Sequence, residues 1–313
     1  MPRQVTIVVI AGGSRPDLTE CLLSLREVRY GNAAALVVDN SLSGLGEELR
    51  TAFPEVDLAR GGALLTFAQA ANFGLARAFS TGCEVALLLN DDTTVHQRAP
   101  GALEEAEREG GPGLYAPEIW PYEPRSERER FAFDWGKRLV VRRPAEMSGK
   151  LTPLDYAEAS ALLVSREVFE KLGGFDEDFG FYFEDADFSV RAHEAGFPVM
   201  EVAGARVWHK GSLSAGRGLS PFKAYFRARN APKFAFKHRD RAHVGANLAY
   251  HAADFLIPQA LRALPGVLVG RRRSAGILAA LASGTLDSMT GRLRHRRRDP
   301  GEEDSLPGRE AGC

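Results

Sequence analysis

The feature that most constrains the fold is a regular alternation of strand-like and helix-like segments. Residues 5–11, VTIVVIA, are almost continuously apolar and rich in β-branched side chains, which is typical of a strand buried on both faces. Residues 16–28 begin with proline and carry apolar side chains on one helical face. Further strands are expected at 34–39, 56–59 and 84–90, with a helix over 67–80. This order predicts an α/β fold with a mostly parallel sheet flanked by helices.

The second half of the chain resumes this rhythm after a charged interruption. Residues 121–150 are dense in charge, and RLVVRR at 138–143 predicts a short exposed strand. Strands are then expected at 157–165, 198–202 and 205–209, and helices at 166–173 and 184–196. Composition shifts toward alanine and leucine after residue 236. We therefore predict a domain over 1–236, a helical C-terminal extension over 237–292, and a disordered basic and polar tail over 293–313.

Composition excludes several classes of protein. The formal net charge of −1 over 313 residues gives no reason to expect nucleic acid as a partner. Three scattered cysteines indicate a reducing compartment and no disulfide framework or zinc site. The apolar run at the N-terminus is too short for a signal peptide, and no stretch is long enough for a membrane span. A soluble, cytoplasmic protein is expected.

Acidic residues follow two of the expected strands. Asp39 ends the strand at 34–39, and Asn90, Asp91 and Asp92 follow the apolar run EVALLL. Ligands of open α/β sheets bind at the carboxyl ends of strands, so these side chains would share one crevice if the strands are neighbours. The alternative interpretation of NDDTT is a polar turn or a helix cap. A dinucleotide-binding loop is disfavoured, because the glycine spacing that it needs is absent after the first strand.

A second group of candidate residues lies between 173 and 209. Glu184, Asp185 and Asp187 gather near an expected helix start, where the helix dipole stabilises negative charge. Ordinary acidity at a helix N-terminus is one explanation. The neighbouring phenylalanines favour another, because carboxylates near bulky apolar groups can have raised pKa values and serve as general bases. His209 ends an expected strand and is either a structural histidine or a ligand of metal or phosphate.

Taken in order, these motifs resemble those of family 2 glycosyltransferases with the GT-A fold, in particular the rhamnosyltransferase-like branch. The resemblance covers about residues 4–236. It rests on VVDN (37–40), TFAQAANFG (66–74), LNDD (89–92), GGFDEDFGFYFEDADFSVRAHEAG (173–196), ARN (228–230) and WH (208–209). Several ordered motifs at fitting distances are much more specific than any one of them.

The resemblance implies a role for each matching residue. Asp185 would be the catalytic base, with Glu184, Asp187 and Glu158 supporting it or contacting the acceptor. Asp92 and His209 would hold a divalent cation, Mg²⁺ or Mn²⁺, that neutralises the diphosphate leaving group. The donor would be bound by Asp39, Asn72, Asn90, Asp91, Arg191, Arg229 and Asn230.

Three departures from the family pattern affect these expectations. The first loop reads AGGSRP, which leaves the contacts to the nucleotide base uncertain. One of two paired asparagines is replaced by Ala71, which removes a polar contact near the donor. Glu158 and Ala159 replace a small residue and a glycine before the acceptor site, which alters the choice of acceptor.

The expected function is an inverting, metal-dependent transfer of a sugar from a nucleotide-diphosphate donor. The expected donor is dTDP-rhamnose in preference to a UDP-sugar. The expected acceptor is a glycan, a lipid-linked glycan or a small molecule. A nucleotidyltransferase and a catalytically silent sugar-nucleotide-binding or assembly protein are the alternatives. The apolar segments at 253–270 and 275–289, with their arginine clusters, suit either peripheral contact with the inner membrane face or packing on the catalytic domain or on a homodimer partner.

Overall fold

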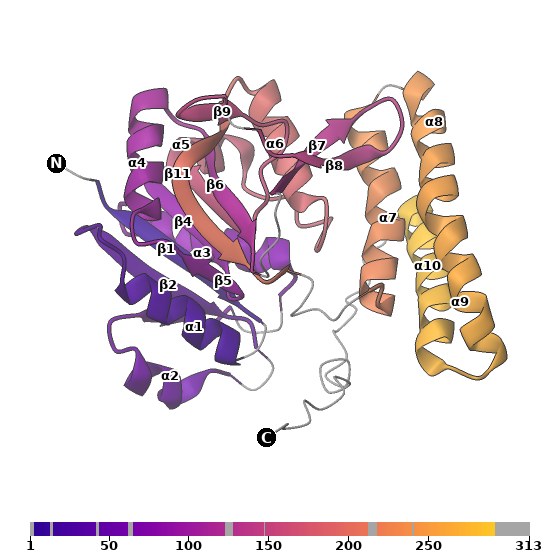
Figure 1. The fold of residues 1–313 in the computed structure, drawn as a ribbon, viewed down its shortest axis with the longest axis horizontal. Helices are drawn as coiled ribbons and strands as arrows, with labels where there is room; N and C mark the ends of the chain where they lie inside the picture. The colour runs from indigo at the N-terminus through magenta and orange to yellow at the C-terminus, as the bar shows by residue number, and fades with distance from the viewer. Residues whose placement is uncertain are drawn as a thin grey trace.

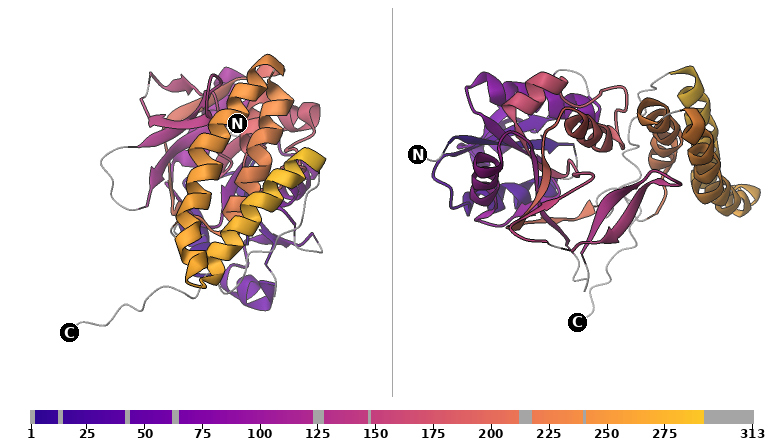
Figure 2. Two further views of the ribbon diagram at one scale, coloured as in Figure 1. Left: turned by 90° about the vertical axis from the view of Figure 1, so that its right-hand side faces the viewer. Right: turned by 90° about the horizontal axis from the view of Figure 1, so that it is seen from above.

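The computed structural model describes residues 3–12, 15–41, 44–61, 65–122, 128–146, 148–211, 218–239 and 241–291. An α/β body built around a large sheet occupies one side of the molecule, and a group of long helices stands beside it (Figure 1). A β-hairpin reaches from the body toward these helices (Figures 1 and 2).

The central sheet is mixed but mostly parallel. Its strands follow the spatial order β3-β2-β1-β4-β10-β6-β11-β5, and β9 pairs with β11. The register places β10, β5 and β9 against the direction of the other six strands. The strands are β1 (Val5–Ala11), β2 (Ala33–Asp39), β3 (Asp57–Ala59), β4 (Val85–Asn90), β5 (Thr93–Val95), β6 (Leu114–Pro121), β9 (Leu151–Pro153), β10 (Ala161–Ser165) and β11 (Val199–His209).

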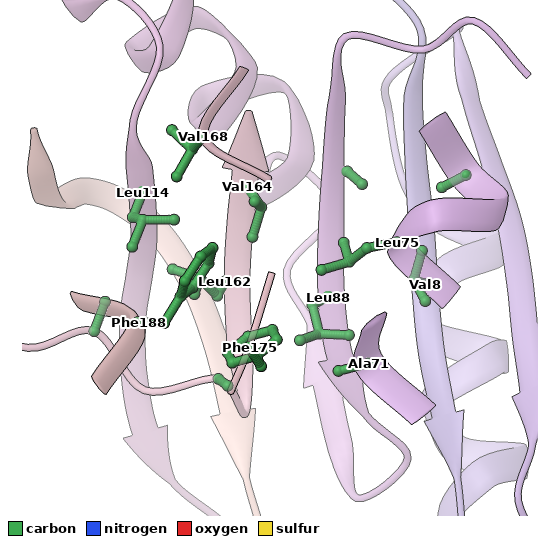
Figure 3. Close-up of a cluster of buried hydrophobic side chains, with 14 of the residues drawn as sticks. Val8, Ala71, Leu75, Leu88, Leu114, Leu162, Val164, Val168, Phe175 and Phe188 are labelled. Atoms are coloured by element: carbon green, nitrogen blue, oxygen red, sulfur yellow. The ribbon is translucent and has the colours of Figure 1, made fainter. Parts of the chain in front are cut away.

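Helices cover both faces of the sheet, which is why its central strands are apolar throughout. Along β4, Leu88 belongs to the core on one face, whereas Leu87 and Leu89 belong to the core on the other (Figure 3 shows the first core). The helices are α1 (Arg15–Arg26), α2 (Gly46–Ala52), α3 (Phe67–Ser80), α4 (Ala99–Gly110), α5 (Arg166–Leu172) and α6 (Glu184–Glu194).

The strand register brings the candidate residues to one edge of the sheet. In the parallel ladders, Ala11 of β1 is level with Asp39 of β2, and Ile10 is level with Asn90 of β4. The antiparallel strand β10 begins at this edge, because Ala161 pairs with Leu89. The acidic ends of β2 and β4 therefore lie at the same edge of the sheet, with β1 between them, as a shared crevice requires.

Some elements differ from the sequence-based expectation. The strand expected over 157–165 begins only at Ala161, so residues 157–160 form a loop at the edge of the sheet. The two strands expected at 198–202 and 205–209 are one strand, β11, whose register to β6 shifts between Val202 and Arg206. This irregularity contains Gly204 at a φ of +80°, a conformation that glycine adopts without strain.

The C-terminal extension is helical over its described residues. The hairpin of β7 (Glu129–Asp134) and β8 (Leu139–Pro144), which includes the exposed strand expected at 138–143, lies much earlier in the chain than this extension. The helices of the extension are α7 (Pro221–His238), α8 (Arg241–His251), the π-helical segment η2 (Ala252–Leu256), α9 (Ile257–Leu268) and α10 (Arg272–Thr290). Helix α7 crosses the boundary expected at 236, and the tail expected at 293–313 lies outside the described residues. None of the helices described is long and apolar enough to cross a membrane.

Gly74 lies where α3 packs closely on the sheet. A Cβ atom at this position would lie 2.5 Å from Val8 Cγ1 and 2.8 Å from Val38 Cγ2. We expect Gly74→Ala to lower the free energy of unfolding by about 1–3 kcal/mol through overpacking. Urea denaturation measures this. The matched control is Gly245→Ala in the exposed part of α8, where a Cβ meets nothing within 4 Å and a small gain is expected. Equal effects of the two variants would contradict the tight packing.

Candidate active site

Asp39 organises the loop after β2. Its carboxylate is 5% exposed and accepts hydrogen bonds from Ser41 N (3.1 Å), Ser41 Oγ (2.6 Å) and Leu45 N (2.9 Å). Arg60 Nη1 lies 4.0 Å from Asp39 Oδ2. The sequence predicted that this residue binds the nucleotide. The structure places it at the expected edge, where both carboxylate oxygens are already used by its own loop.

Asp91 and Asp92 occupy the short turn between β4 and β5 and are both buried. Asp91 Oδ2 accepts a hydrogen bond of 3.0 Å from Gly12 N, which connects this turn to the loop after β1. Asp92 Oδ1 lies 3.1 Å from Nε2 of His209, at the end of the neighbouring strand β11. Burial lowers the pKa of His209, but the hydrogen bond and charge of Asp92 outweigh it and raise the pKa above its usual value.

The Asp92–His209 pair offers one oxygen and one nitrogen ligand to a cation. Within the described ranges, no group of three or more His, Cys, Asp or Glu side chains is arranged to hold a metal ion. A divalent cation bound here would therefore need further ligands from the diphosphate of a substrate and from water. Mg²⁺ is commonly held in this way, by one or two carboxylates and substrate phosphates. The residues present fit such a cation.

Asp185 lies in the first turn of α6, facing the loop at 157–160. Its Oδ1 accepts hydrogen bonds from Tyr156 Oη (3.0 Å) and Ala186 N (2.9 Å), and its Oδ2 accepts one from Ala159 N (3.2 Å). Burial raises the pKa of Asp185, although these hydrogen bonds oppose the rise. The result is a carboxylate held in a fixed orientation with increased basicity.

Two other carboxyl groups surround Asp185. Glu184 is 6% exposed, and burial and the charge of Asp185 raise its pKa well above the usual value. Its Oε2 has no hydrogen-bond partner among the described residues. Burial raises the pKa of Glu158 to about 7, and the charge of His209 opposes this shift. The charges of both Asp185 and His209 affect the pKa of Glu158. The residues predicted to contact the acceptor and those predicted to hold the metal are therefore close to one another.

Asp187 is two residues from Asp185 but has a different environment. It is fully buried and contacts Arg191 Nε (2.7 Å), Lys237 Nζ (2.6 Å) and His238 Nε2 (2.8 Å). Burial would raise its pKa, but the His238 hydrogen bond and the neighbouring cations lower it to about 2. Contact with an acceptor was one of its predicted roles. These contacts favour the other predicted role, which is to hold the candidate base in place, because Asp187 and Asp185 share the first turn of α6.

Arg191 and Asn72 both fasten the Gly173–Gly174 turn that precedes α6. Arg191 donates hydrogen bonds to the carbonyl oxygens of Leu172 and Gly174 as well as to Asp187. The Asn72 amide donates to Phe175 O (2.9 Å), and its Oδ1 accepts from Phe175 N (2.8 Å). Their contact with a donor stays a prediction. The contacts present favour a positioning role for both side chains.

Arg229 and Asn230, on α7, hold the loop that leads into α6. Asn230 has no exposed surface, and its amide nitrogen lies 2.7–2.9 Å from the carbonyl oxygens of Phe179, Phe181 and Tyr182. Arg229 is 1% exposed and donates to Asp178 O and Asn230 Oδ1. Side chains buried to this extent cannot reach a donor without rearrangement, so the contacts favour positioning over donor binding.

This loop contains backbone strain directly before the candidate base. Tyr182 and Phe183 have φ values of 63° and 73°, which are unfavourable for residues with a side chain. The Asn230 amide binds the Tyr182 carbonyl at this point. The strained geometry thus fixes where α6 begins, and with it the position of Glu184 and Asp185.

Sequence reasoning missed Tyr156, the side chain that orients Asp185. No motif includes it, and only its position two residues before Glu158 could have drawn attention to it. Tyr156 and Glu158 border a small pocket beneath the hairpin, which adjoins a second pocket of about 340 Å³. The side chains lining both pockets include Arg130, Phe131 and Leu154. The candidate base is connected to a pocket that reaches the hairpin through its hydrogen-bond partner Tyr156.

Comparison with solved structures identifies the class of fold. TarS residues 1–349 from S. aureus matches over 94% of this chain and 93% of its own, at a TM-score of 0.56 and 11% identity. A mannosyltransferase from Pyrobaculum calidifontis, solved with GDP-Man and Mn²⁺, matches over 92% and 88%, at a TM-score of 0.55 and 13% identity. GalNAc-T7, solved with UDP, GalNAc and Mn²⁺, matches over 81% and 58%, at a TM-score of 0.57 and 16% identity. The chain has the GT-A fold of glycosyltransferases, as the sequence predicted.

Two curated proteins are similar in sequence to short segments of the chain. An N-acetylglucosaminyl-diphospho-decaprenol L-rhamnosyltransferase of Mycobacterium tuberculosis is 40% identical over 65 residues, which are 21% of each chain. The low-salt glycan biosynthesis hexosyltransferase Agl10 of Haloferax volcanii is 29% identical over 80 residues, 26% of each chain. The matched segments thus span about a quarter or less of the relatives' length. No model of a known protein family matches the chain. The resemblance to rhamnosyltransferases and hexosyltransferases is confirmed within these segments.

Proposed function

We propose that this protein is an inverting glycosyltransferase that moves a sugar from a nucleotide-diphosphate donor to an acceptor hydroxyl. One observation carries the proposal, the loop at 157–160 that joins two sites. Ala159 N donates to the candidate base Asp185, and Ser160 O accepts a hydrogen bond of 2.9 Å from Asn90 N at the end of β4. A carboxylate with a raised pKa is thereby fixed beside the strand ends that carry Asp39, Asp92 and His209.

On the donor side, the strand ends supply the binding groups. Asp92 and His209 would hold the divalent cation, which when bound neutralises charge on the leaving diphosphate. Gly12 N and Asp91 join the loops after β1 and β4, so the floor of this site is rigid. Asp39 shapes the loop after β2 and would meet the nucleoside through that loop or by exchanging one of its internal hydrogen bonds.

On the acceptor side, Asp185 would remove the proton of the attacking hydroxyl. The oxygen then bonds to the anomeric carbon from the face opposite the nucleotide, and the bond from that carbon to the diphosphate breaks. A single displacement of this kind inverts the anomeric centre. Tyr156 donates a hydrogen bond that orients the base, and Tyr156 and Glu158 border the same small pocket. The proposed donor is dTDP-rhamnose in preference to a UDP-sugar, because the relative with 40% identity is a rhamnosyltransferase.

The proposed acceptor is a glycan attached to a lipid. The same relative is named for transfer to a diphospho-decaprenol lipid, which supports this choice over a small molecule. Its identity to this chain is confined to 65 residues, so the acceptor is tested directly by offering lipid-linked and free oligosaccharides to the purified enzyme.

A thermal-shift experiment tests the donor and cation assignment. Donor at about one hundred times its Kd should stabilise the protein by about 2.7 kcal/mol, since it binds only the folded state. We expect dTDP-rhamnose with Mn²⁺ to raise the Tm by several degrees, and EDTA to remove most of the shift. Asp92→Asn should lose the part of the shift that depends on Mn²⁺, because a carboxylate ligand becomes a neutral amide.

The control for this experiment is Asp57→Asn, at an exposed strand start away from the site. Its shifts should match those of the unchanged protein. Donor binding that is equally strong with EDTA would contradict the cation role of Asp92 and His209. A shift with nucleoside triphosphates but with no nucleotide sugar would instead favour a nucleotidyltransferase.

A further inference from the structure

Helix α9 presents an apolar face that nothing in the described structure covers. Ile257, Leu261, Leu264 and Leu268 are spaced by three or four residues and therefore lie on one side of the helix. The exposed fractions are 55% for Ile257, 60% for Leu261, 44% for Leu264, 85% for Leu268 and 71% for the adjoining Val269. Only Ala263 of this helix is fully buried. Exposed large apolar side chains grouped in this way mark an interaction surface.

Arginines accompany this apolar face. Arg262, Arg271 and Arg272 are exposed, and no ion pair to them is found among the described residues. Residues 257–273 contain four arginines and no aspartate or glutamate. The α9 surface, defined here as the five apolar side chains above with Arg262, Arg271 and Arg272, is therefore apolar and positively charged.

We propose that the α9 surface docks on an anionic lipid bilayer. A helix with leucines on one face and arginines beside them lies in the plane of a membrane interface, with its apolar side chains among the acyl chains. The arginines then face lipid phosphates at the depth where these side chains usually lie. This proposal does not depend on catalysis, and it would bring the enzyme to a lipid-linked acceptor.

The same charges disfavour a second copy of the chain as the occupant. A twofold dimer places identical surfaces against each other, so the arginines of one α9 surface would meet those of its partner. Within 257–273 no acidic side chain is present to compensate them. The neighbouring acids do not serve either, because Asp254 is paired with Arg138 and Asp287 is buried against Tyr225.

The position of α9 in the fold suits docking. Helix α9 lies on the outer side of the helical extension, away from the sheet (Figures 1 and 2). In Figure 1 the turn between α9 and α10 lies at the lower right, whereas β11 ends near the middle of the view. A bilayer in contact with this outer side would lie alongside the helical extension, away from the sheet (Figures 1 and 2).

Vesicle flotation of the full-length protein tests the proposal. We expect binding to vesicles of phosphatidylglycerol and phosphatidylcholine in equal amounts, and little binding to phosphatidylcholine alone. Leu261→Glu/Leu268→Glu should weaken binding at least about tenfold, because charges replace the inserted side chains. Arg271→Gln/Arg272→Gln should weaken it by about tenfold or more, and added salt should weaken it further.

Matched variants elsewhere on the surface serve as controls. Leu23→Glu changes an exposed leucine of α1, and Arg50→Gln/Arg77→Gln removes two exposed arginines from α2 and α3. These should bind vesicles like the unchanged protein, and circular dichroism should show that all variants are folded. Absence of binding to the anionic vesicles, or equal loss in control and α9 variants, would overturn the proposal. A dimer that Leu261→Glu/Leu268→Glu converts to a monomer, without vesicle binding by the unchanged protein, would also overturn it.

Discussion

Asp185→Asn is expected to lower kcat for sugar transfer about a thousandfold, within the range that a general base contributes. The asparagine side chain has nearly the same shape, and its oxygen can still accept the hydrogen bond from Tyr156 Oη, whereas its NH2 group cannot accept the one from Ala159 N. It cannot take a proton from the acceptor hydroxyl. Donor binding should persist, because the groups proposed to hold the donor lie at the strand ends. Transfer rates with labelled donor, and the Kd of the donor by calorimetry, measure the two effects separately.

Asp178→Asn is the matched control for this variant. Asp178 belongs to the same acidic segment, but its side chain is 75% exposed and its carboxylate pairs with Lys233. Its substitution should leave kcat nearly unchanged. Burial raises the pKa of Asp185, so the rate should fall toward acid at a higher pH than an ordinary aspartate with a pKa of 3.8 would cause. Unchanged turnover in Asp185→Asn would exclude this residue as the base.

Asp187→Asn is expected to lower the free energy of unfolding by about 3 kcal/mol, because it leaves buried cations without their counter-charge. Arg191, Lys237 and His238 all contact this carboxylate, and their helices α6 and α7 are joined through it. Urea denaturation measures the loss. Glu48→Gln breaks the exposed pair with Arg15 and should change stability by less than about 0.5 kcal/mol.

The pH dependence of stability provides a second test of the Asp187 cluster. The folded-state pKa of about 2 lies below the ordinary value of 3.8, so the folded protein holds the charged form more strongly than the unfolded chain does. Its contribution to stability is therefore complete above about pH 4 and is lost as the pH falls toward 2. Asp187→Asn should show a smaller loss of stability across this interval. The same loss in both proteins would contradict the cluster.

Much of the sheet was predictable because its signals are local. The run at 5–11 and the three leucines of β4 are apolar without interruption, as strands covered on both faces must be. Strands β5, β6, β7 and β9 were not predicted. The three residues of β5 and β9 give no periodicity, and Pro117 and Pro121 interrupt the apolar pattern of β6. The break within β11 was read as two strands because Gly204 interrupts the apolar pattern, although pairing with β6 continues on both sides.

The candidate site likewise has some features that follow from the local sequence and others that depend on tertiary contacts. The sequence alone determined that acids would stand at strand ends and that Asp185 and Asp187 would start a helix, because these are properties of neighbouring residues. Only the tertiary structure decided that Asp185 accepts a hydrogen bond from Tyr156, whereas Asp187 is enclosed by Lys237 and His238. Those partners come from elements far along the chain, and burial against them sets one pKa high and the other low. The tertiary structure also decided which face of α9 is exposed, because it determines which side of the helix packs against neighbouring elements.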